Sequence, residues 1–127
     1  MEFRQNEAIY LQIADLACEN VLSGAWKTGD RVPSVRELAG EIEVNPNTVV
    51  RTYAYLQDQG IIQNQRGLGY YVAERAPEVT RDLMRRTFVS RDLPRVFRTM
   101  DLLGMGLEEL RGLYEGRQRG NGKEKTS

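Results

Sequence analysis

The sequence predicts an α+β fold that is mostly helical, with a winged helix-turn-helix domain followed by a short all-α dimerisation segment. Two helix start signals lie close together, at Ser34 and Asn45, and a Gly-tipped pair of strand-like runs follows at residues 61–73. After Pro77 the apolar residues recur at helical spacing. Two short helices followed at once by a hairpin are the element order of a winged helix.

The first helix is expected over residues 8–22, because its apolar residues fall on one face: Ile9, Ile13, Leu16, Ala17 and Val21. Gly24 is expected to end this helix. Cys18 lies in the same stretch, so we interpret it as a small core residue and not as a redox switch. Trp26 is expected to hold the following loop against the core; stacking on a ligand is the alternative.

The next two helices carry clear start signals. Ser34, with Glu37 three residues later, predicts a capping box in which each side chain satisfies a free backbone N–H. Asn45 predicts a second N-cap, followed by Pro46 at the first helical position, where its missing N–H costs nothing. Such a pair is often plain structure. It is also typical of a helix-turn-helix, whose second helix enters the DNA major groove by its N-terminal residues.

A hairpin is expected directly after these helices. Gly60 ends the second helix, residues 61–65 read as a strand, residues 66–69 as a turn and residues 70–73 as the antiparallel partner. Gly67 and Gly69 permit backbone angles closed to other residues and let the tip lie close to a phosphate backbone. The alternative is that these glycines only close the hairpin.

In the second helix of the motif, Val49, Tyr53 and Leu56 are expected to face inward, which leaves polar residues toward the groove and solvent. Asn can read adenine, Arg can read guanine, and Thr can contact a phosphate or a thymine methyl group. We expect Asn47 and Arg51 to contact base edges. The candidate DNA-binding residues are Arg31, Ser34, Arg36, Asn45, Asn47, Thr48, Arg51, Thr52, Tyr55, Arg66, Gly67 and Gly69.

The runs at residues 31–39, 44–49, 59–62 and 66–72 together resemble the DNA-binding domain of the GntR regulators. The run at residues 44–51, with a short remainder after the wing, resembles the YtrA branch of that family. The resemblance implies a repressor, often encoded beside transporter genes. Two positions depart from longer family members: Pro46 and Val50 stand where some of them carry a basic residue.

The net charge of zero needs explaining in a DNA-binding chain. Residues 1–75 hold seven Arg or Lys against ten Asp or Glu, yet residues 44–73 contain a single acid, Asp58. Counterion release depends on the charges that face phosphate and not on the total. Arg51 and Arg66 lie within that acid-poor stretch, and two helix N-termini add free N–H donors. The charge distribution therefore permits DNA binding.

After residue 76 the sequence predicts helices that carry more large apolar residues than they can bury on themselves. Pro94 is expected to interrupt them, Gly104 and Gly106 to mark a break, and residues 107–114 to form a last short helix. The expected divisions are 1–75, 76–116 and a disordered tail at 117–127. A homodimer interface is expected, with an effector pocket as the alternative, formed by Leu83, Met84, Phe88, Phe97, Met100, Leu103, Leu110 and Leu113.

Composition favours a cytoplasmic regulator. No apolar run is long enough to span a membrane, and the first residues do not form a signal peptide. With no histidine and one cysteine, the usual zinc ligand sets are lacking, so no metal, cofactor or enzymatic activity is expected. Two interpretations stay open: a homodimeric regulator, expected to repress from an inverted-repeat DNA operator, or a winged-helix interaction module that contacts protein or RNA.

Overall fold

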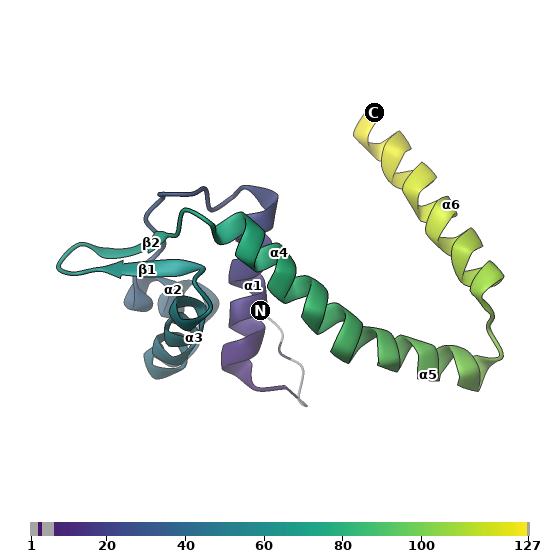
Figure 1. Cartoon of the computed structure of the whole chain (residues 1–127), viewed down its shortest axis with the longest axis horizontal. Helices are drawn as coiled ribbons and strands as arrows, with labels where there is room; N and C mark the ends of the chain where they lie inside the picture. Colours follow the sequence, from purple (N-terminus) through teal and green to yellow (C-terminus); the bar gives the residue numbers. More distant parts are fainter. Residues whose placement is uncertain (1–2, 4–6, 127) are drawn as a thin grey trace. The chain divides into compact units, whose positions relative to one another are not determined.

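The computed structural model describes the backbone of residue 3 and residues 7–126, and the side chains of residue 3 and residues 7–117. The chain divides into two compact units, Met1–Arg86 and Thr87–Ser127. The first unit confirms the winged helix-turn-helix (Figure 1). Its elements are α1 (Ile9–Ser23), α2 (Val35–Ile42), α3 (Pro46–Asp58), β1 (Ile62–Gln65), β2 (Gly69–Val72) and α4 (Ala76–Thr87), whose last residue begins the second unit.

The local start and stop signals work as the sequence predicted. Ser34 Oγ accepts the Glu37 N–H at 3.1 Å, and Glu37 Oε1 accepts the Ser34 N–H at 3.1 Å. Asn45 Oδ1 accepts the Asn47 N–H at 2.8 Å and so caps α3. Past the end of α3, Gly60 has φ +83°, which lets the Ile61 N–H donate to the Leu56 carbonyl at 2.9 Å. These bonds satisfy backbone groups that helix ends leave free.

The wing is anchored by a short third segment that the sequence did not reveal. β1 and β2 pair antiparallel, with Ile62 opposite Val72. Arg31 also pairs with Tyr71 across an antiparallel bridge, and the Val32 N–H donates to the Tyr70 carbonyl at 2.9 Å. The segment that leads into α2 is thereby hydrogen-bonded to the wing.

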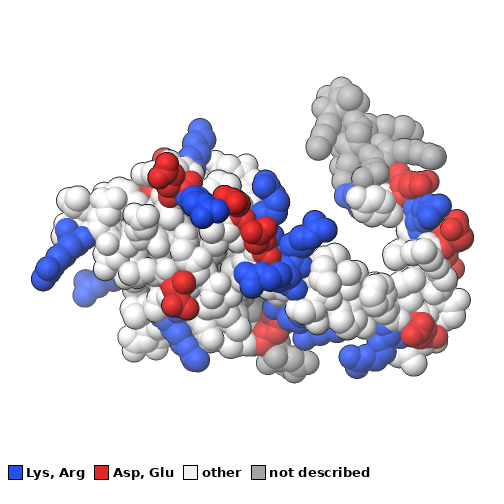
Figure 2. Space-filling view, viewed as in Figure 1, with Lys and Arg blue, Asp and Glu red and all other residues white. Residues whose placement is uncertain are grey.

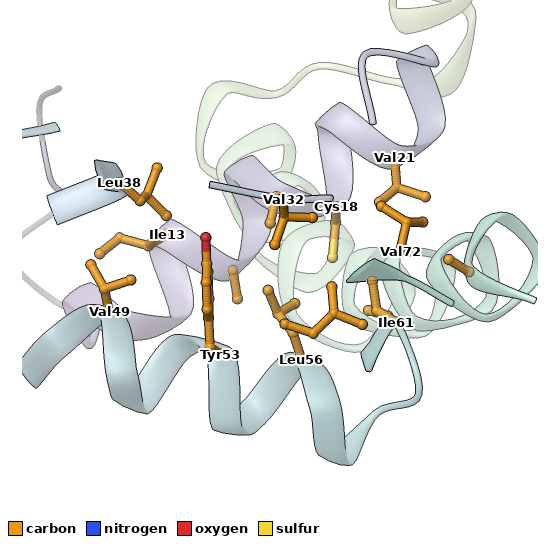
Figure 3. Close-up of a cluster of buried hydrophobic side chains, with 14 of the residues drawn as sticks. Ile13, Cys18, Val21, Val32, Leu38, Val49, Tyr53, Leu56, Ile61 and Val72 are labelled. Atoms are coloured by element: carbon orange, nitrogen blue, oxygen red, sulfur yellow. The ribbon is translucent and has the colours of Figure 1, made fainter. Parts of the chain in front are cut away.

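The core lies between the helices and the sheet of the first unit (Figure 3). Val49, Tyr53 and Leu56 project from α3 toward α1 and are fully buried, as expected. Cys18 is also buried, and burial raises the pKa of its thiol to about 12, which keeps the thiol protonated and confirms a core residue. Trp26 is partly buried against the same core, as predicted for a loop anchor.

α4 belongs to the first unit by its packing. Ala76 and Thr80 are fully buried, and Leu83 and Met84 pack partly buried against the winged-helix core. The compact unit therefore extends past the expected boundary at residue 75, to Arg86. The surplus of apolar residues after residue 76 predicts Leu83 and Met84 in a dimer interface, but both pack against the core of their own chain. Both residues are therefore already used in the packing of the first unit.

The second unit contains η1 (Phe88–Asp92), a π-helical segment, then α5 (Leu93–Leu103) and α6 (Leu107–Thr126). η1 ends at Asp92, two residues before Pro94, whose ring removes an N–H and crowds the preceding turn, so the expected interruption is confirmed. Gly104, at φ +69°, ends α5 as predicted.

The C-terminal helix is longer than expected. The sequence reading ended it at residue 114 and expected disorder over residues 117–127, but α6 continues to Thr126. Its Arg, Gln, Glu and Lys residues are good helix formers, and they offset the cost of its glycines. Ser127 lies outside the described residues.

One hydrogen bond of the core is open to a direct stability test. The Tyr53 hydroxyl donates to the Pro33 carbonyl at 2.6 Å. Tyr53→Phe should lower the free energy of unfolding by about 1–2 kcal/mol, because the carbonyl loses its donor in a partly buried site. Tyr71→Phe is the matched control, since its hydroxyl forms no hydrogen bond within the described residues. Urea unfolding of both variants measures the difference; equal stabilities would contradict the assignment.

Candidate nucleic-acid interface

α3 separates its buried and exposed faces cleanly. Its buried residues are Val49, Thr52, Tyr53 and Leu56. The opposite face carries Asn47 and Arg51, both exposed, one turn apart at the N-terminal end of the helix. This is the end that a helix-turn-helix inserts into the major groove. The structure thus places the two predicted base-reading residues on the outer face of α3.

Thr52 is not a surface residue, and its prediction as a DNA contact is wrong. It is fully buried, and its hydroxyl lies 2.9 Å from the Tyr10 carbonyl and 3.1 Å from the Thr48 carbonyl, so it can donate to either. Its spacing of three residues from Val49 would have placed it on the inner face, but its polarity suggested solvent. Tyr55 is partly buried and packs edge-on against Tyr10, so it lies on the flank of α3.

The capping residues at the two helix starts keep limited capacity for DNA. Ser34 Oγ and Asn45 Oδ1 each already accept a backbone N–H. What remains for a phosphate oxygen is the Ser34 hydroxyl proton and the Asn45 amide group. Thr48 is half-buried in the first turn of α3, and Arg36 is exposed in the first turn of α2. Both helix N-termini also offer free backbone N–H groups to an anion.

The wing presents a basic tip. Arg66 is exposed in the turn, which the Leu68 N–H closes by donating to the Gln65 carbonyl at 2.8 Å, with Gly67 at φ +79°. In Figure 2 a basic side chain projects from the end of the hairpin. The tight turn therefore holds a positive charge at the point of the wing that extends furthest from the core.

Gly69 makes room for Arg31. A Cβ atom at Gly69 would lie 3.1 Å from Arg31 Nε, closer than ordinary van der Waals contact. The guanidinium of Arg31 therefore lies directly against the wing beside its turn, where Gly69 pairs with Gln65. The sequence assigned both residues to DNA binding, and the structure brings the two together.

These arginines are free to meet phosphate. Within the described residues, none of the four side chains Arg31, Arg36, Arg51 and Arg66 forms an ion pair with a carboxylate. Binding to DNA would therefore break no salt bridge, and each charge can displace a condensed counterion.

Two exposed apolar residues were missed by the sequence reading. Val50 on α3 is 51% exposed and Leu68 at the wing tip is 62% exposed. Apolar side chains in these positions can contact a thymine methyl group or a sugar. The sequence could have shown that Val50 is exposed, because Val49, Tyr53 and Leu56 already define the inner face of this helix and Val50 lies outside it.

The comparisons with known proteins agree with this geometry. Residues 9–72 match the family model for bacterial regulatory proteins of the gntR family. The chain belongs to the GntR family. It is 37% identical over 109 residues to the HTH-type transcriptional regulator YhcF of Bacillus subtilis (strain 168), covering 86% of this chain and 88% of that protein. To the HTH-type transcriptional repressor YtrA of the same strain it is 39% identical over 107 residues, covering 84% and 82%.

A solved structure supports the same assignment. The crystal structure of a GntR-family regulator from Bacteroides thetaiotaomicron matches with a TM-score of 0.69 at 41% identity, over 89% of this chain and 99% of that one. The similarity to YtrA-type regulators confirms the predicted branch. The chain is a DNA-binding transcription regulator and not an enzyme. Among the described residues, no helix is long and apolar enough to cross a membrane.

Three of these arginines and Asn47 divide into two groups with different expected effects on DNA binding. Arg51→Ala or Asn47→Ala should reduce the binding free energy for the preferred sequence by about 1–3 kcal/mol and relax the preference at one base pair. Arg66→Ala or Arg36→Ala should lower the affinity for all DNA sequences alike. Each should also reduce the slope of log affinity against log salt concentration by about one. Fluorescence anisotropy at several salt concentrations separates the two patterns.

Gln57→Ala is the matched control for this series, because Gln57 is exposed on α3 but lies away from its N-terminal end. It should leave affinity and base preference unchanged. Arg51→Ala with unaltered base preference would exclude Arg51 from the major groove.

Proposed function

We propose that the protein is a homodimeric repressor that binds an inverted-repeat operator through the winged helix of each subunit. The observation that supports the proposed dimer is the exposed apolar surface of the second unit. Leu102 is 81% exposed and Leu103 is 70% exposed. The other large exposed apolar residues of this unit are Phe88, Val89, Val96, Phe97, Leu107, Leu113 and Tyr114.

Part of this surface forms a stripe along α5. Val96, Met100 and Leu103 recur at spacings of four and three residues, with Phe97 beside them. Exposed apolar residues on this scale are typical of a surface that a partner covers. The proposed interface therefore keeps Phe88, Phe97, Met100, Leu103, Leu110 and Leu113 of the predicted set.

A second copy of the chain is the partner that suits an operator with inverted half-sites. A two-fold interface uses the same patch on both subunits and relates the two winged helices by the same symmetry as the inverted half-sites. Joining two winged helices makes the second half-site contact intramolecular, which raises affinity without new contacts. Half-sites about one helical turn apart, roughly 34 Å, fit this arrangement.

Repression is supported by size and by resemblance. The second unit offers little surface for dimer contacts and for recruiting polymerase as well, so blocking a promoter is the simpler action. The relative YtrA is named as a repressor. We place the protein in the cytoplasm, where chromosomal operators are found in bacteria.

The dimer is tested by weakening the apolar stripe in the full chain. Phe97→Gln combined with Leu103→Gln should convert the protein to a monomer at micromolar concentration and lower operator affinity at least tenfold, because two large apolar contacts are lost on each subunit. Arg98→Gln is the matched control, since Arg98 is exposed on α5 outside the stripe. Sedimentation velocity measures the oligomeric state. A wild-type monomer, or a double variant that stays dimeric, would refute this interface.

Repression is tested in a reporter strain. Expression from the operator-containing promoter should rise when the gene is deleted and fall again when the wild-type gene is restored. The Arg51→Ala variant should restore repression poorly, because it binds the operator weakly. A fall in expression on deletion would identify an activator.

A further inference from the structure

One contact joins α1 to the exposed face of α3. The guanidinium carbon of Arg51 lies 4.0 Å from the centroid of the Tyr10 ring, which places the charged group over the face of the ring. Arg51 forms no ion pair within the described residues, so this ring is the contact that orients its side chain.

Tyr10 itself is held on two sides by α3. Its ring meets Tyr55 edge-on, with centroids 6.3 Å apart and an interplanar angle of 75°. Its backbone carbonyl lies 2.9 Å from the buried Thr52 hydroxyl, which can donate to it. Tyr10 therefore has little freedom to move relative to α3, and the ring is a rigid platform beside Arg51.

We infer that Tyr10 is a positioning residue, which holds the Arg51 guanidinium in the orientation needed to read a base and thereby sets sequence specificity from α1. The inference rests on the proposed base contact of Arg51. It assigns to the first helix, which lies outside the helix-turn-helix, a share in base selection.

The geometry of a stacked guanidinium explains how this works. Stacking uses the flat face of the group and leaves the N–H donors around its edge available. Bidentate recognition of guanine uses that edge and requires a defined plane. Arginine has high rotamer entropy, so an unsupported side chain would lose more freedom on binding than one already stacked. The Tyr10 ring therefore lowers the cost of the specific contact without affecting contacts to phosphate.

The experiment uses the full-length protein and duplex DNA. Selection from random duplexes with the wild type defines the preferred sequence, and anisotropy then gives affinities for it and for each single-base-pair variant. Tyr10→Leu removes the aromatic face, and Tyr10→Phe keeps it. Tyr10→Leu should reduce discrimination at the base pair read by Arg51 about two- to fivefold, the size expected of an exposed cation–π contact. Tyr10→Phe should match the wild type.

A role in packing alone would give a different pattern. If Tyr10 served only in packing, Tyr10→Leu would lower the affinity for all duplexes equally. If Tyr10 positions Arg51, the substitution changes the preference at one base pair and leaves the affinity for unrelated duplexes unchanged. In an Arg51→Ala background, Tyr10→Leu should have no further effect on discrimination, because the group that it positions is gone. Leu22→Ala is the control in α1, since Leu22 is exposed at the other end of that helix.

A second measurement avoids any variant that folds poorly. In the free wild-type protein, the Arg51 side-chain protons should be shifted upfield in NMR spectra by the current of the Tyr10 ring. Random-coil shifts there, or full discrimination by a folded Tyr10→Leu protein, would overturn the inference. If Arg51→Ala itself left the base preference intact, the proposed base contact would fail instead, and the two failures are thus distinguishable.

Discussion

Tyr53 joins the three parts of the winged helix that carry the candidate DNA-binding residues. Its ring is fully buried in the inner face of α3, and its hydroxyl donates to the carbonyl of Pro33, just before α2. The same ring packs edge-on against Tyr70 of β2, with centroids 5.0 Å apart. Burial raises the pKa of the Tyr53 hydroxyl well above its usual value, so it remains a donor at every pH the protein meets. One side chain thus sets α3 against both the start of α2 and the wing.

A recognition helix must divide few residues between core and DNA. Val49, Thr52, Tyr53 and Leu56 are all committed to the core, and Tyr55 lies partly buried on the α1 side. Asn47, Val50 and Arg51 remain at the exposed N-terminal end of α3. With so few side chains available, the orientation of each one matters for specificity. The contact between Tyr10 and Arg51 is the kind of support that a small reading surface requires.

The sequence predicted best what depends on neighbours along the chain. The capping box at Ser34, the N-cap at Asn45 and the glycine turn after α3 are local chemistry, and all three are present. It failed where a distant partner decides. Thr52 can be buried because the Tyr10 carbonyl of α1 accepts a hydrogen bond from its hydroxyl. Leu83 is partly buried because it packs against the winged-helix core. Arg31 joins the wing through Tyr71, forty residues away in the chain. The spacing of Thr52 from Val49 does indicate the inner face of α3, but no periodicity in the sequence reveals which distant segment each of these residues pairs with.

The zero net charge is compatible with DNA binding because acidic residues are sparse in the part of the first unit that holds Arg51 and Arg66. Acidic residues lie on α1 and around the end of α2, among them Asp15, Glu19, Glu41 and Glu43, whereas residues 44–73 contain Asp58 alone. Phosphate repels the acid-bearing parts and attracts the exposed arginines of the helix starts and the wing. The acids therefore cost little affinity while they disfavour encounters in the wrong orientation. A neutral chain of this kind should bind non-specific DNA more weakly than a uniformly basic one, so specific contacts, such as the one proposed for Arg51, are expected to be the main source of affinity differences between sites.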